Sequence, residues 1–225
     1  MSNHAHSDTE KGHSGGYQVG NNDPASYTPR PSRIANPAPA GLFSFASTTF
    51  LLSMYNVNTR GIHTTNAVLG MAIFGGGLVQ LLAGMWEFPR GNVFGATAFS
   101  SYGAFWMSYS VLFIPGTGVM DAYVGKEAEF HNAVGMYLIV WFMVTFMFIA
   151  PVLRRSVAFT ALLSFLALAL LMLGIAEFTG NIMITRAGGG FGIITGLIAY
   201  YIGVSEMLSA EKSAFMRVPL GNFNQ

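Results

Sequence analysis

Six long stretches without a charged residue constrain this chain more than any other feature of its sequence. Each stretch holds about 19 to 30 residues, and a helix that crosses a membrane needs about 20 apolar residues. Charged residues bound every stretch. We therefore expect six transmembrane helices, near residues 38–57, 66–87, 92–115, 131–153, 156–177 and 187–207.

The composition supports a membrane protein and excludes several other classes. Only 9% of the residues are charged and 52% are hydrophobic, whereas a soluble domain carries about 25% charged residues. The chain has no cysteine, which excludes disulfides, thiolate metal sites and thiol catalysis. The formal net charge of +1 lacks the basic excess of a nucleic-acid-binding protein.

The chain divides into three regions. We expect residues 1–33, which are rich in Ser, Gly, Asn, Pro and His, to form a disordered tail. A six-helix transmembrane domain over residues 34–209 follows, and a short tail over residues 210–225 completes the chain. Eight lysines and arginines fall on one side of the expected spans and three on the other, which predicts that both termini are cytoplasmic.

The ionisable residues limit the chemistry available inside the membrane, where unpaired charges are costly. All three lysines lie outside the expected spans, and no span carries a histidine near its middle. Glu87, Glu177 and Glu206 fall at span ends. These positions exclude a retinal Schiff base, a bis-histidine haem and an intramembrane protease. We expect no enzymatic activity, no metal site and no cofactor.

Polar side chains gather in the first three expected spans. They are Ser47, Thr48 and Thr49 in the first span, Gln80 in the second, and Thr97, Ser100 and Ser101 in the third. Such groups can donate hydrogen bonds to a small anion without adding a fixed negative charge. The pattern predicts a polar path. The alternative is that these hydroxyls bond to their own helix or join neighbouring helices.

Two short segments repeat along the chain. Glu87-Phe88-Pro89-Arg90-Gly91-Asn92 ends the second expected span, and Glu177-Phe178-Thr179-Gly180-Asn181 ends the fifth. A repeat of three helices would place its two copies in opposite orientations, as in many transporters. The alternative is that these two short segments match by chance.

The start of the first span resembles a family signature. Asn36, Pro37, Ala38 and Pro39 lead into Ala40, Gly41 and Leu42, where proline suits the first helical turn. This segment resembles the N-P-A-P-L-G-L signature of the acetate uptake transporter family, although Ala40 stands where Leu is usual. The family includes the bacterial succinate–acetate permease, the yeast acetate permeases and the ammonia-transport-outward proteins. The stretches Gly91-Asn92, Thr97–Trp106 and Gly180-Asn181 match further family motifs, and the resemblance covers residues 34 to 215.

The resemblance implies an architecture and a set of pathway residues. It implies six helices per subunit and a hexamer in which each subunit has its own pathway. It also implies a narrow constriction formed by Phe45, Tyr102 and Leu166. Phe45 and Tyr102 lie in the matching motifs, and Leu166 follows from an ungapped comparison between Tyr137 and Asn181.

The expected function is the transport of acetate across a fungal plasma membrane. Succinate and other small monocarboxylates are further candidate substrates, with protons and the lipid bilayer as the other partners. A carboxylate is strongly disfavoured at an apolar constriction, so we expect passage of the neutral acid in a channel-like, proton-linked manner. Two alternatives remain open: a channel for a small neutral solute such as ammonia, and a non-transporting acetate sensor or scaffold.

Overall fold

The structure is a computed structural model that describes residues 34–211 and 213–223. The expected disordered tail, residues 1–33, lies outside the described residues. Within the described part, six long helical segments follow one another. They are α1 (Ala38–Asn56), the segment α2–η3–α3 (Val68–Met71, Ala72–Val79 and Gln80–Glu87), α4 (Val93–Phe113), α5 (Glu127–Ile149), α6 (Val157–Thr179) and α7 (Ile182–Ala210).

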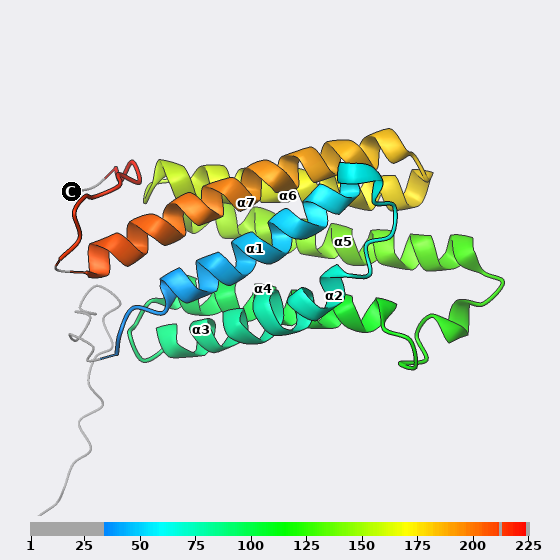
Figure 1. Cartoon of the computed structure of the whole chain (residues 1–225), viewed down its shortest axis with the longest axis horizontal. Coiled ribbons are helices and arrows are strands. Elements are labelled where there is room, and N and C mark those ends of the chain that lie inside the picture. The colour runs from blue at the N-terminus through cyan, green and yellow to red at the C-terminus, as the bar shows by residue number, and fades with distance from the viewer. Residues whose placement is uncertain (1–33, 212, 224–225) are drawn as a thin grey trace, which may run out of the picture.

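The six segments run back and forth along one long axis (Figure 1). The start of α1, the turn between α3 and α4, and the end of α7 lie at one end of the bundle. The turn between α6 and α7 lies at the opposite end. An even number of crossings therefore returns the chain to the end where the described residues begin.

Four of the described helical segments are long and apolar enough to cross a membrane: Val68–Glu87, Glu127–Val152, Val157–Thr179 and Ile182–Ala210. The other two, α1 and α4, have 19 and 21 residues, or about 28 and 32 Å at 1.5 Å per residue. These lengths match a hydrocarbon core of about 30 Å. Their hydroxyl and glycine content lowers their hydropathy.

Two helices begin earlier than the charge pattern predicts. Helix α5 begins at Glu127 and α7 at Ile182, whereas the expected spans begin at 131 and 187. In α5, acidic residues of the first turn are favourable at the positive end of the helix dipole. In α7, the side chain of Asn181 accepts a hydrogen bond from the Met183 amide at 2.9 Å. Both first turns thus extend beyond the uncharged stretch, in α5 because of the helix dipole and in α7 because of the Asn181 cap.

The middle of the second span is a π-helix, η3, which the sequence pattern did not predict. A Cβ atom at Gly76 would lie 2.7 Å from the ring of Trp106 on α4. A Cβ atom at Gly103 on α4 would in turn lie 2.7 Å from the Leu81 backbone. Glycine at these positions lets the two segments approach closely, the usual device of helix packing in lipid.

The C-terminal segment, residues 213–223, packs back on the bundle. Gly221 accepts a hydrogen bond from the Val157 amide at 3.0 Å, and Leu220 accepts one from the Ala158 amide at 3.2 Å. The hydroxyl of Ser205 on α7 donates to the Val218 carbonyl at 2.6 Å. The segment therefore satisfies amides at the start of α6 that have no partner within the helix.

Candidate functional site

Three side chains from three helices meet near the middle of the bundle: Phe45 on α1, Tyr102 on α4 and Leu166 on α6. All three are buried, with 5%, 5% and 6% of their surface exposed. The rings of Phe45 and Tyr102 lie 5.7 Å apart between centroids. The same three residues line two separate cavities. We call them the constriction.

The position of Tyr102 is fixed from the side of α5. Its hydroxyl donates a hydrogen bond to Thr145 Oγ1 at 3.0 Å. Its ring packs edge-on against Phe148 at 5.9 Å and tilted against Trp141 at 6.3 Å. Because its hydroxyl already has a partner on α5, Tyr102 contributes its ring to the constriction.

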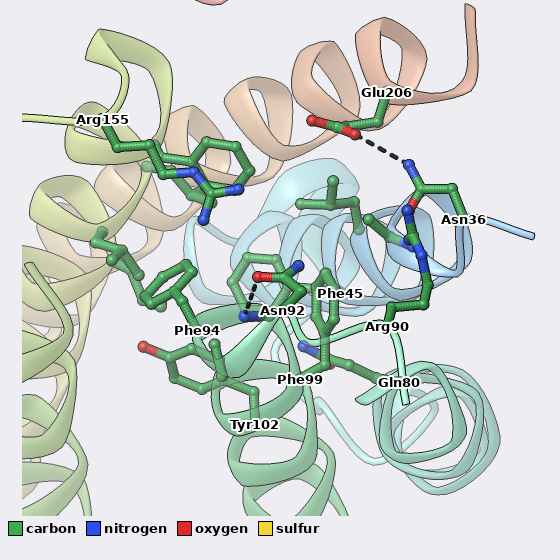
Figure 2. Close-up of a pocket in the computed structure, with 18 of the residues that line it drawn as sticks. Asn36, Phe45, Gln80, Arg90, Asn92, Phe94, Phe99, Tyr102, Arg155 and Glu206 are labelled. Atoms are coloured by element: carbon green, nitrogen blue, oxygen red, sulfur yellow. Dashed lines mark hydrogen bonds between the residues drawn. The ribbon is translucent and has the colours of Figure 1, made fainter. Parts of the chain in front are cut away.

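The first cavity has a volume of about 330 Å³ and reaches from the constriction to the end of the bundle where α1 begins. Its inner wall is apolar and includes Phe94, Phe99, Leu162 and Leu163. Its outer wall carries Asn36, Arg90, Arg155 and Glu206, which we call the first mouth (Figure 2). An apolar cavity with a few convergent polar groups is the usual form of a small-molecule site.

On one side of the first mouth a network of hydrogen bonds connects the polar side chains. Asn36 donates from Nδ2 to Glu206 Oε2 at 3.1 Å, and its Oδ1 accepts from Arg90 and from the Ala38 amide. Arg90 Nη1 also forms an ion pair with Glu87 Oε2 at 3.4 Å. Asn36 therefore caps the start of α1 and links it to α7 and to the turn after α3.

Arg155 lies on the other side of the first mouth (Figure 2). Its guanidinium lies 5.7 Å from the centre of the Phe159 ring, a cation–π distance. Among the described residues Arg155 forms no ion pair. Its positive charge is therefore available to an anion that enters the first cavity.

The second cavity is smaller, about 90 Å³, and lies on the other side of the constriction. Its outer wall carries Asn56, Glu177 and Thr185, which we call the second mouth. Glu177 Oε2 lies 2.6 Å from Nδ1 of His131 on α5. The side chains of this pair are 58% exposed for His131 and 32% for Glu177, so water screens their charges.

Three buried polar atoms beside the cavities have no hydrogen-bond partner among the described residues: Gln80 Oε1, Thr49 Oγ1 and Trp106 Nε1. Gln80 lines the first cavity, and Thr49 and Trp106 line the second. A buried polar group without a partner is costly. A bound solute or water can satisfy such groups.

The other residues singled out from the sequence lie away from both cavities. Pro37 and Pro39 flank the first turn of α1. The hydroxyls of Thr48 and Thr97 donate to carbonyls four residues earlier in their own helices. Ser47 accepts from the Tyr200 hydroxyl of α7 at 2.8 Å. Neither Ser100 nor Ser101 lines a cavity. Thr48 and Thr97 therefore bond to their own helices, Ser47 joins α1 to α7, and the cavity walls are mainly apolar.

No motif in the sequence connects Arg155, Thr145 or Trp141 with a site, and Glu206 stands there only at a span end. Asn36 and Glu206 are 170 residues apart, so no local pattern could pair them. The one available signal was the arginine pair Arg154-Arg155, which stands between two uncharged stretches.

These features define a class of protein. Six apolar helical segments of membrane length enclose two cavities that reach a shared constriction from opposite sides. This is the architecture of a multi-pass membrane transport protein, in which polar groups at depth face a cavity instead of lipid.

Comparison with known proteins identifies the family. A family model described as the GPR1/FUN34/yaaH family matches residues 19–224, and the chain belongs to this family of membrane transporters. Ammonia transport outward protein 2 of Saccharomyces cerevisiae is 45% identical over 187 residues, which are 83% of this chain and 66% of that protein. Acetate permease A of Emericella nidulans is 41% identical over 201 residues, 85% of this chain and 67% of that protein.

Bacterial proteins match over nearly their whole length. The succinate-acetate/proton symporter SatP of Escherichia coli is 35% identical over 181 residues, 80% of this chain and 92% of the symporter. A solved structure of the bacterial acetate channel SatP superposes with a TM-score of 0.73 at 34% identity, covering 84% of this chain and 100% of that chain. The six-helix fold is therefore shared with a known channel.

Proposed function

We propose that this protein transports acetate across the plasma membrane, with succinate and other small monocarboxylates as further substrates. The observation that carries the proposal is the pair of cavities that meet at Phe45, Tyr102 and Leu166. The names of an acetate permease and an acetate channel among the relatives point to the substrate.

The walls of the two cavities suit a small carboxylic acid. Polar groups at the two mouths can bind the charged form, whereas the constriction offers two rings and one aliphatic side chain. A carboxylate loses its hydration there without gaining an opposite charge, which is strongly unfavourable. The acid therefore crosses the constriction in its neutral form, and one proton accompanies each carboxylate.

Orientation and assembly are part of the proposal. Arg90, Arg154 and Arg155 lie toward one end of the bundle and Arg186 toward the other, which favours a cytoplasmic first mouth. We propose a hexamer with one pathway per subunit. Large exposed apolar side chains such as Phe74, Phe146 and Leu197 are available to lipid and to neighbouring subunits. The mass of the protein in lipid nanodiscs tests the assembly.

The proposal is tested by uptake of labelled acetate into proteoliposomes with an inward proton gradient. Phe45→Asp puts a charge at the constriction and should abolish uptake. Phe215→Asp makes the same change at a side chain that is 88% exposed and lines neither cavity, and it should transport like the wild type. Wild-type uptake no faster than in protein-free vesicles, from demonstrably folded protein, would contradict the proposal.

A second candidate is a channel for a neutral solute such as ammonia. It is favoured by the 45% identity to ammonia transport outward protein 2, and an apolar constriction admits a small uncharged molecule. Methylammonium flux without acetate flux would support this candidate. An acetate response retained when Phe45 and Tyr102 carry charged substitutions would support the third alternative, a sensor or scaffold.

A further inference from the structure

The first mouth contains Arg90, Arg155 and Glu206, and the buried Glu87 lies behind Arg90; these four charged side chains are not equivalent. Glu87 is fully buried and already pairs with Arg90 at 3.4 Å. The remaining two, Arg155 and Glu206, both line the first cavity and lie on opposite sides of its opening (Figure 2). Among the described residues Arg155 has no ion-pair partner, and the side chain of Glu206 accepts a hydrogen bond from the neutral amide of Asn36 and forms no ion pair. This second pair is free to respond to an entering anion.

A carboxylate that enters the first cavity meets opposite effects from these two side chains. Arg155 attracts it, whereas ionised Glu206 repels it and occupies the Nδ2 donor of Asn36. With Glu206 ionised, the charges of Arg90, Arg155, Glu87 and Glu206 sum to zero. A proton on Glu206 makes the sum +1, so that one bound carboxylate restores neutrality. Capture of the anion and uptake of one proton by Glu206 therefore favour each other.

We propose that Glu206 is the protein group that carries the transported proton at the first mouth, and that Arg155 holds the carboxylate beside it. This proposal rests on the proposed carboxylate transport. The O–H bond of protonated Glu206 breaks, and an O–H bond forms on the bound carboxylate. The neutral acid then crosses the constriction, and Glu206 takes its next proton from water. The same steps in reverse serve the opposite direction.

The other titratable and charged groups near Glu206 are less suited to this role. Glu87 does not line the cavity, and Arg90 is joined to both Asn36 and Glu87. The groups facing Glu206 come from the turn after α3, the turn before α6 and the C-terminal segment. They are Arg90 and Glu87, Arg154 and Arg155, and Arg217. At the second mouth Glu177 faces a histidine, and none of the residues lining that cavity is an arginine.

The test is acetate exchange in proteoliposomes, with equal pH and equal acetate on both sides, so that no gradient drives flux. Half-saturating acetate is measured at about pH 3.5 and about pH 7.5, which lie below and above the ordinary pKa of a glutamate, about 4.3. The variants are Glu206→Gln, which keeps an acceptor for Asn36 Nδ2, and Glu177→Gln as the matched change at the second mouth. Any effect of acetate's own protonation is common to all three proteins.

We expect Glu206→Gln to bind acetate about tenfold more tightly than the wild type at the higher pH, because one negative charge near the site is removed. The two proteins should bind equally at the lower pH, so the variant loses the part of the pH dependence that Glu206 adds to that of acetate itself. Glu177→Gln should retain the wild-type dependence. Unchanged pH dependence in Glu206→Gln, beside normal wild-type exchange, would overturn the proposal.

A second variant keeps the proposal falsifiable if Glu206→Gln does not fold. Arg155→Gln should raise the acetate concentration that gives half-maximal exchange about tenfold at both pH values, and the pH dependence should remain. Unchanged binding in Arg155→Gln would overturn the assigned pair. Absence of exchange in the wild type itself would instead contradict the proposed function.

Discussion

Each mouth contains a turn of the same kind, one after Glu87 and one after Glu177. The two mouths differ in the side chains that surround this turn. After Glu87 and after Glu177 the chain passes through a glycine with positive φ, Gly91 at 76° and Gly180 at 63°. An asparagine then caps the next helix: Asn92 accepts from Gly95 and Asn181 from Met183. The two turns lie at opposite ends of the bundle (Figure 1). The repeated letters therefore correspond to a repeated local structure.

The difference lies in the partner of each glutamate. Glu87 is fully buried and pairs with an arginine that its own turn supplies. Glu177 is partly exposed, lines the second cavity and pairs with His131 from another helix. A buried carboxylate with a permanent cation serves to hold the mouth together, whereas water screens a largely exposed pair, which therefore contributes little to stability. The same turn thus supports a buried ion pair at the first mouth and a largely exposed pair at the second.

The largest expected effect tests this difference through stability. Arg90→Leu leaves Glu87 buried without its cation and should lower the free energy of unfolding by about 3 kcal/mol. His131→Gln breaks a largely exposed pair and should lower it by less than about 1 kcal/mol. Denaturant unfolding in a mild detergent measures both. Equal losses would show that the two pairs do not differ as described.

The next prediction concerns the wall that separates the two cavities. Tyr102→Ala removes a ring that lines both of them, so the opening should widen. The ratio of uptake of a larger monocarboxylate to uptake of acetate should rise about tenfold, the order expected when a pocket gains room for a few carbon atoms. Thr145→Val removes only the partner of the Tyr102 hydroxyl and serves as the control. A ratio unchanged in Tyr102→Ala would place the size limit elsewhere.

A smaller effect tests whether the two turns are equivalent. Asn92→Ala and Asn181→Ala each remove a side-chain cap and should each lower the free energy of unfolding by about 1 kcal/mol. Gly91→Ala and Gly180→Ala force alanine into a positive φ and should each cost about 1 kcal/mol. Strongly unequal losses within either pair of variants would argue against a shared turn.

The smallest effect concerns residues 1–30, which lie outside the described residues. Deletion of residues 1–30 leaves Asn36 and the start of α1 intact, so acetate flux at equal surface expression should not change. Uptake by intact cells, normalised to surface protein, measures this. A loss of flux would show that the N-terminal region takes part in transport.

The sequence predicted the number and the approximate positions of the helical segments because charged residues are confined to their ends. It predicted the start of α1 at Ala38 because two prolines mark the first turn. The π-helix in the second span escaped prediction, since the segment packs closely against α4 at Gly76 and Gly77 and no local pattern encodes that contact. The first turns of α5 and α7 escaped prediction because acidic residues at the start of α5 and the Asn181 cap of α7 stabilise a turn beyond the apolar stretch.

The site was less accessible to sequence reasoning than the fold. Phe45, Tyr102 and Leu166 came from family resemblance alone, because a buried aromatic or leucine gives no sign of lining a cavity. The hydroxyls of Thr48 and Thr97 pointed to a polar path, yet they bond to their own helices. The contact between Asn36 and Glu206 depends on the packing of α1 against α7, which no local pattern encodes.

The central claim is that the two cavities belong to one pathway that opens on opposite sides of the membrane. The chain contains no cysteine, so single cysteines can report access directly. Ala98→Cys lies in the first cavity and Ala169→Cys in the second. A membrane-impermeant thiol reagent should modify the two from opposite faces, and acetate should slow both reactions. Modification of both from the same face would contradict the account.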